Sequence, residues 1–191
     1  MEHVLKGLAL YDRDKHRSHA LTYGGHDPAV CGKGQGALML WLLGYPDQAA
    51  RQARDGIGLS ETLTHVPSVV HALWWATVAY QLRRDPPAVL NCAKRLLAVS
   101  DEHGMSQHRA IGGIMHGWAF AHLSDIQNGL SEMRPAVISY PGTQRSYWPR
   151  RNCALAISTA QSLHCKMPRR FPMRLARRSG EPRCWALKAT S

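Results

Sequence analysis

Apolar residues recur along the first 141 positions at the spacing of helices, three and four residues apart. The segment AVLNCAKRLLAVS carries one such face, made of Val89, Cys92, Ala93, Leu96 and Leu97. The segment IGGIMHGWAFAHL carries a second, made of Ile111, Ile114, Met115, Trp118 and Ala119. No stretch between such segments has the alternating pattern of a strand. The pattern therefore predicts an all-α fold.

The predicted helices come in pairs, and the pairs repeat. WLLGYPDQAARQA around Ala49 matches YQLRRDPPAVLNCA around Ala88 and AHLSDIQNGLSEM around Gly129, at offsets of 39 and 41 residues. Two helices per period of about 40 residues are typical of an α-solenoid. We expect a tetratricopeptide-like α-solenoid of about two and a half helix pairs, with these small residues where paired helices approach closely. EHVLKGLALYD resembles the second helix of a pair, so we expect the chain to begin within an array.

Several helix ends are marked by residues that satisfy free backbone groups. Asp27 and Asp85 each precede a proline, which predicts an N-cap followed by the first helical residue. Ser124 and Gln127 have the spacing of a capping box. Gly104 is a predicted C-terminal stop.

The net charge of +11 is concentrated at the C-terminus. Residues 142–191 contain eleven Lys and Arg but one acid, Glu181, whereas residues 1–141 are nearly neutral. The helical period also ends near residue 142, where Arg, Pro, Ser and Cys become frequent. We expect two regions: a helical repeat array over 1–141 and a disordered, low-order basic tail over 142–191. A frameshift near residue 142 would produce such a tail, so the chain is interpreted as a fragment.

The tail is also the basis of an alternative function, non-specific binding of nucleic acid. Its basic and aromatic side chains could neutralise phosphates and stack on bases; they are Arg150, Arg151, Arg169, Arg170, Arg174, Arg177, Arg178, Trp148 and Phe171. The tail lacks a folded module that reads bases. We therefore favour the interpretation that the tail is unselected over the interpretation that it binds nucleic acid.

Cysteine and apolar content predict the compartment. The five cysteines include no C-x-x-C pair, which argues against a disulfide framework and a compact zinc module. No apolar run approaches the roughly 20 residues of a membrane helix. The N-terminus does not have the pattern of a secretory signal. We expect a cytoplasmic protein that does not associate with membranes.

The stretch GGHDPAVCGKGQG could be a phosphate-binding loop. A P-loop would require a glycine where Asp27 stands and a hydroxyl where Gly34 stands. The dinucleotide pattern fails because Gly32, Gly34 and Gly36 are spaced G-x-G-x-G without a preceding strand. The stretch instead predicts a turn, an N-cap at Asp27 and a helix that ends at Leu43. Its three glycines should weaken this helix, so we interpret the segment as an eroded copy of a repeat helix.

Metal and catalytic sites are not expected, and neither is a cofactor. His16, His19, His26 and Cys31 cluster in sequence but lack two tight ligand pairs. The remaining histidines considered are dispersed: His116 and His122 project from different helix faces, and His103 and His108 flank the predicted stop. Cys31 and Cys92 lie in apolar helical contexts typical of inert thiols. Motifs such as G-x-S-x-G and H-E-x-x-H are missing from the sequence.

Tryptophans are interpreted as packing residues rather than as a ligand cage; they are Trp41, Trp74, Trp75 and Trp118. One of the adjacent pair Trp74 and Trp75 should point away from its neighbour. If that ring is exposed on the concave face of the array, it is a candidate hot spot for a protein partner.

Four short stretches resemble a known family: GLALYD, YGGHDPAVC, LWLLGYPDQA and AYQLRRD. They are similar to the tetratricopeptide-like array that ends bacterial signalling proteins of the class III adenylate/guanylate cyclase and predicted-ATPase type. The resemblance covers about residues 1–141. Cyclase and Walker motifs are missing from this sequence, so no catalytic residue carries over. The resemblance implies a non-enzymatic protein-interaction module with an unnamed partner and self-association through open array ends.

Overall fold

The computed structural model describes residues 1–16, 18–22 and 24–139, and the predicted basic tail, residues 142–191, lies outside the described residues. Within them the chain forms α-helices and no strand, which confirms the all-α prediction. The helices are α1 (Glu2–Leu10), α2 (Arg13–His16), α3 (His19–Thr22), α4 (Pro28–Leu42), α5 (Pro46–Thr62), α6 (Val66–Leu82), α7 (Pro86–Glu102), α8 (Ser106–Leu123) and α9 (Ile126–Ser139).

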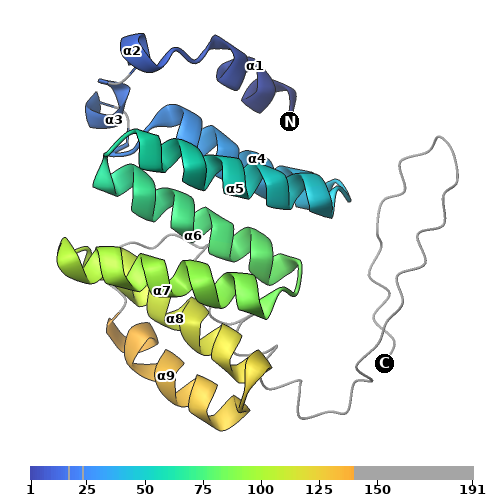
Figure 1. Cartoon of the computed structure of the whole chain (residues 1–191), viewed down its shortest axis with the longest axis vertical. Helices are drawn as coiled ribbons and strands as arrows, with labels where there is room; N and C mark the ends of the chain where they lie inside the picture. The colour runs from blue at the N-terminus through green and yellow to red at the C-terminus, as the bar shows by residue number, and fades with distance from the viewer. Residues whose placement is uncertain (17, 23, 140–191) are drawn as a thin grey trace, which may run out of the picture.

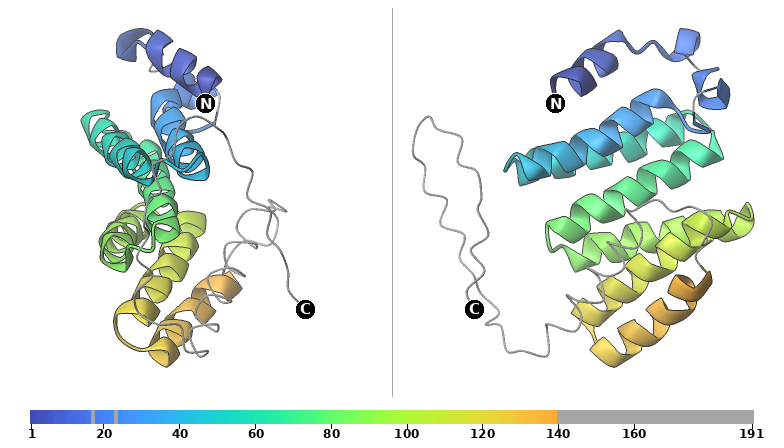
Figure 2. Two further views of the ribbon diagram at one scale, coloured as in Figure 1. Left: turned by 90° about the vertical axis from the view of Figure 1, so that its right-hand side faces the viewer. Right: turned by 180° about the vertical axis from the view of Figure 1, so that it is seen from behind.

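The long helices pack as consecutive antiparallel pairs, α4 with α5, α6 with α7 and α8 with α9 (Figure 1). Each pair also contacts the next, through α5 on α6, α7 on α8, α4 on α6 and α6 on α8. Seen from the side, α5 and α7 lie on one side of α4, α6 and α8 (Figure 2). The prediction of about two and a half pairs is too low. Each of the three matched segments connects the two helices of one complete pair, so the described residues contain three pairs, and α1 precedes them.

The turns between helices explain why the pairs follow one another so regularly. Each of the four turns from α4 to α8 contains one residue with positive φ: Gly44 (87°), Thr64 (50°), Arg84 (58°) and Gly104 (65°). A left-handed residue reverses the chain directly after a helix. The predicted stop at Gly104 is confirmed, since α7 ends at Glu102.

Carboxylates begin three of the helices. Asp27 Oδ1 accepts hydrogen bonds from the backbone N–H groups of Ala29 and Val30, and Asp85 Oδ1 accepts one from Ala88. Both predicted caps are therefore confirmed. The predicted capping box at Ser124 is wrong, because Asp125 is one residue closer to α9 and accepts from the N–H groups of its first turn.

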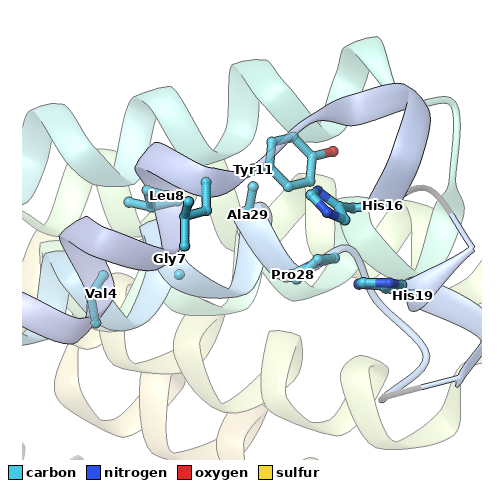
Figure 3. Close-up of a pocket in the computed structure, with 10 residues that line it drawn as sticks. Val4, Gly7, Leu8, Tyr11, His16, His19, Pro28 and Ala29 are labelled. Carbon is cyan, nitrogen blue, oxygen red and sulfur yellow. The ribbon is translucent and has the colours of Figure 1, made fainter.

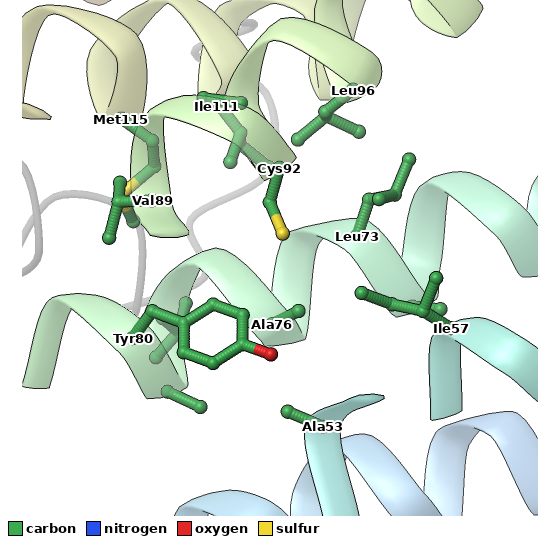
Figure 4. Close-up of a cluster of buried hydrophobic side chains, with 14 of the residues drawn as sticks. Ala53, Ile57, Leu73, Ala76, Tyr80, Val89, Cys92, Leu96, Ile111 and Met115 are labelled. Carbon is green, nitrogen blue, oxygen red and sulfur yellow. The ribbon is translucent and has the colours of Figure 1, made fainter. Parts of the chain in front are cut away.

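The apolar core is continuous across the pairs. Side chains of α5, α6, α7 and α8 meet in one buried cluster that includes Ile57, Leu73, Leu96 and Met115 (Figure 4). Trp118 of α8 is 1% exposed. Each pair thus covers apolar surface of its neighbour.

Small residues mark close approaches, as predicted. Ala49 is fully buried at the start of α5. Gly129 of α9 lies against Gly117 and Ala121 of α8, where a Cβ would meet the Gly117 carbonyl oxygen at 2.6 Å. Ala88, the third predicted position, is partly buried and packs against the core. The close approach is therefore clearest at Gly129.

Candidate functional site

The most distinctive polar cluster lies where α4 and α6 pack together. α6 contributes His71, which is 8% exposed, and Trp75 one turn later. Residues four apart share a helix face, and the Trp75 Nε1–H donates a hydrogen bond to His71 Nε2 at 2.9 Å. An indole N–H only donates, so His71 is neutral with its single lone pair on Nε2.

The two adjacent tryptophans do not point apart. The ring centroids of Trp74 and Trp75 are 5.6 Å apart and nearly parallel, at 20°. Trp74 also makes edge contacts with His71 and with His108 of α8. The prediction that one ring faces away from the other is wrong, because both rings fill the space between α6 and its two neighbours.

Contacts with neighbouring helices explain the glycines of α4. A Cβ on Gly34 would lie 2.7 Å from Trp75 Cγ, so only glycine lets this indole approach α4 so closely. A Cβ on Gly32 would meet Leu8 of α1 at 3.2 Å. The interpretation of α4 as an eroded helix is therefore wrong: these glycines lie at helix contacts. The predicted turn, cap and helix are confirmed, with α4 ending at Leu42 rather than Leu43.

His26 and Cys31 complete the cluster from the start of α4. The His26 ring stacks on His71, with centroids 3.6 Å apart and planes at 12°. One ligand atom each of His26, Cys31 and His71 lie within 4.8 Å of one another. Cys31 is partly exposed, and Gln35 donates a hydrogen bond to its Sγ at 3.4 Å.

The sequence cluster of four candidate ligands therefore divides in two. His16 and His19 lie beside each other, with ring centroids 5.0 Å apart, and line a different site. Sequence reasoning missed His71, which follows Cys31 by a whole helix pair. Only the repeat gave a signal for it, because a 40-residue period places the first helices of successive pairs side by side.

Burial keeps these imidazoles neutral. It lowers the pKa of His71 to about 3, aided by the nearby His26 and His108. Burial is also the main cause that lowers the pKa of His26 and of His108. It raises the pKa of the Cys31 thiol. At neutral pH the cluster therefore offers imidazole lone pairs and a thiol.

A second site is the cavity of about 290 Å³ between α1 and α4 (Figure 3). Val4 and Leu8 of α1 form one wall, and His16 and His19 close one end. Most of its lining is apolar. A larger cavity of about 490 Å³ lies between α3 and the α5–α6 turn, with Asp27 and His65 in its wall.

Asp27 connects three segments around these cavities. Its Oδ2 accepts a hydrogen bond from the Tyr11 hydroxyl at 2.8 Å, and its backbone N–H donates to Ser68 Oγ at 2.8 Å. Ser68 Oγ also lies 2.9 Å from His65 Nδ1. Burial and the Asp27 carboxylate raise the pKa of Tyr11, so the phenol remains a donor. The network fixes α1 and α4 against the start of α6.

We expect Asp27→Ala to lower the free energy of unfolding by about 1.5 kcal/mol, because it removes an N-cap and the acceptor of the Tyr11 hydroxyl. Urea unfolding followed by circular dichroism measures the loss. Asp125→Ala is the matched control, since Asp125 also caps a helix but is exposed. Equal losses in both variants would contradict a structural role for the buried network.

The other named side chains have ordinary structural surroundings. His116 reaches Glu132 of α9, with 2.6 Å between Nδ1 and Oε2, while His122 Nδ1 lies 2.9 Å from the Trp118 carbonyl oxygen. The two rings therefore have different neighbours, as predicted. Cys92 lies in the core, where burial raises its pKa to about 11. Its thiol stays protonated at neutral pH, as expected of an inert packing residue.

Comparison with known proteins gives one relationship of note and no assigned activity. No family model matches the chain, and no solved structure matches it. An uncharacterized protein of Rhizobium meliloti (strain 1021) is 32% identical over 138 residues. The match covers 69% of this chain but 13% of that protein, so the chain spans about an eighth of the length of its relative. Among the residues described by the structure, no helix has the length and apolar character needed to cross a membrane.

Proposed function

We propose that the chain is a non-enzymatic protein-interaction module built as a tetratricopeptide-like α-solenoid. The arrangement of three consecutive helix pairs, each packed on the next with a period of about 40 residues, supports this proposal. Arrays of this kind present the first helices of their pairs along one extended surface. In this chain those helices are α4, α6 and α8.

The observation that carries the proposal is the partly exposed strip of side chains across these helices. Trp75 of α6 packs against Gly34 of α4, and Trp74 makes an edge contact with His108 of α8. Both tryptophans are partly exposed, as are Cys31 of α4 and His108. Tryptophan is enriched among residues that dominate binding energy, particularly where rings are held rigidly. Here the rings are fixed by stacking and by the His71 hydrogen bond, so they would lose little conformational entropy on binding.

The setting we propose is a larger cytoplasmic signalling protein. The relative in Rhizobium meliloti is several times longer than this chain, which is consistent with an array that forms one part of a multidomain protein. The sequence resemblance suggests a cyclase-type or ATPase-linked regulator.

Exposed leucine and isoleucine side chains at the two ends, Leu5 and Leu10 on α1 and Ile138 on α9, support self-association through the array ends.

Site-specific photo-crosslinking in the native host tests this proposal. A crosslinker at the exposed Gln35 of α4 should form an adduct with a discrete protein, whereas one at the exposed Lys94 of α7, on the other side of the array, should not. A crosslinker at Ile138 should capture a second copy of the chain. Equal labelling from Gln35 and Lys94, or none from either, would contradict an interaction surface on α4, α6 and α8.

The alternative function has its own diagnostic result. The basic composition of residues 142–191 favours nucleic acid if the tail is functional. In that case binding to a labelled oligonucleotide should weaken steeply with salt and disappear when the tail is deleted. The Gln35 adduct would then be absent.

A further inference from the structure

We propose that His26, Cys31 and His71 form a binding site for a zinc-class transition-metal ion, which would join α4 to α6. The inference stands apart from the proposed function, because it rests on side-chain chemistry at one junction rather than on a partner. Nothing in the sequence spacing predicted it. Packing of α4 on α6 brings His71 to the two residues that the sequence placed together.

The separation of the three donors fits a metal ion after a small contraction. Zinc bonds of about 2.0–2.3 Å in tetrahedral geometry place neighbouring ligand atoms about 3.3–3.8 Å apart. The donors of His26, Cys31 and His71 lie within 4.8 Å of one another, so each needs to move by an ångström or less. The His26 ring must also turn out of its stack on His71, because the lone pairs of two parallel imidazoles do not converge on one ion. His26 can make this movement, because it precedes the first residue of α4 and follows two glycines with positive φ.

One of the two histidines already has a partner that orients a metal ligand, whereas the other must exchange its partner. His26 makes a hydrogen bond with the Gly24 backbone that favours the protonated ring, so the ring donates to the carbonyl. Metal-bound histidines usually donate their second ring nitrogen in this way. His71 has its lone pair directed at the Trp75 N–H. Since a neutral imidazole has one lone pair, ligation through either nitrogen must break the bond to Trp75.

The donor set selects the metal. Two imidazoles and one thiolate suit Zn²⁺ and its analogues, whereas Mg²⁺ and Ca²⁺ prefer oxygen. Ligation replaces the S–H bond of Cys31 with a metal–sulfur bond, and the proton passes to solvent. Three protein ligands leave a fourth position for water. The ion would bridge the first helices of two successive pairs and thereby stabilise the array.

Titration of the full-length, reduced, metal-free protein with Co²⁺ as a spectroscopic probe tests the site. We expect saturation at one equivalent, a thiolate-to-cobalt charge-transfer band and a change in tryptophan emission, with Zn²⁺ displacing Co²⁺ and Mg²⁺ having no effect. Cys31→Ala should abolish the band, and Cys92→Ala should retain it. His26→Gln and His71→Gln should each weaken binding at least tenfold, the loss caused even by an outer partner of a metal ligand.

One further variant, Trp75→Phe, and the His26→Gln variant already named separate metal binding at this site from misfolding. Trp75→Phe should keep the charge-transfer band but lose most of the emission response. His26→Gln lies outside the helices, so it tests ligation even if Cys31→Ala does not fold. A charge-transfer band that persists in Cys31→Ala, or Co²⁺ affinity unchanged in both His26→Gln and His71→Gln, would overturn the proposal. Absence of a saturable band in the parent protein would overturn it as well.

Discussion

Lowering the pH from 6.5 to 4.5 should reduce the free energy of unfolding by about 2 kcal/mol through His71 alone. The folded protein holds the pKa of His71 at about 3, whereas the pKa of this histidine in the unfolded chain has its ordinary value of 6.5. A lowered histidine pKa means that the unfolded state binds protons first. The stabilisation is therefore complete above pH 6.5 and declines as the pH falls toward 3.

Two neighbours should make this acid sensitivity larger. His26 stacks on His71, and His108 of α8 contributes further positive potential when protonated. The pKa of each is also lowered, chiefly by burial. Protonating any one of the three opposes protonation of the others. Acid should therefore lower the free energy of unfolding already between pH 6.5 and 4.5, where carboxylates with their usual pKa values of about 4 are still mostly ionised.

Urea unfolding at several pH values, with a chelator present, measures this dependence. His71→Gln is the informative variant, because its amide oxygen can still accept the Trp75 N–H but does not titrate. We expect it to remove most of the slope between pH 6.5 and 4.5. His103→Gln is the matched control, since His103 is exposed at the end of α7. A slope that is unchanged in His71→Gln would show that the acid sensitivity arises elsewhere.

Local signals in the sequence were sufficient for the helices and their order. Asp27 and Asp85 cap helices through bonds that span three residues or fewer, so their roles follow from nearby sequence. Ser124 failed because Asp125, a better-placed acceptor, stands beside it. The 40-residue offset revealed the pairing because each pair repeats the same turn. The count of pairs was too low only because matched turns were not equated with complete pairs.

The candidate site depended on packing that local sequence does not determine. His26 and Cys31 were recognised as candidate ligands, but with His16 and His19 as partners rather than His71. The stacking of Trp74 on Trp75 and the contact of Trp75 with Gly34 likewise arise from how α6 docks on α4. Helix propensity alone made Gly34 look like a defect. A contact across helices reverses that interpretation.

The same reversal underlies our last expectation, that Gly129→Ala should lower the free energy of unfolding by about 3 kcal/mol. Alanine normally stabilises a helix relative to glycine by about 1 kcal/mol. At this position, however, the added Cβ would meet Ala121 and, at 2.6 Å, the Gly117 carbonyl oxygen. Gly117 is constrained in return, since its own Cβ would lie 2.7 Å from the Gly129 carbonyl oxygen.

Backbone atoms cannot rotate away as a flexible side chain can. α9 would therefore have to move from α8 by about an ångström, which would disrupt the packing of Met133, whose side chain is 1% exposed. Because α9 is the last helix described, the cost should appear as early loss of helical signal in urea as well as a lower midpoint.

Gly58→Ala in α5 provides the opposite case, since its Cβ would meet nothing within 4 Å. We expect Gly58→Ala to stabilise the protein by about 1 kcal/mol. If Gly129→Ala lowers the free energy of unfolding and Gly58→Ala raises it, contact between helices rather than helix propensity determines the need for glycine at position 129. Stabilisation by both substitutions would mean that α8 and α9 do not approach as closely as the structure indicates.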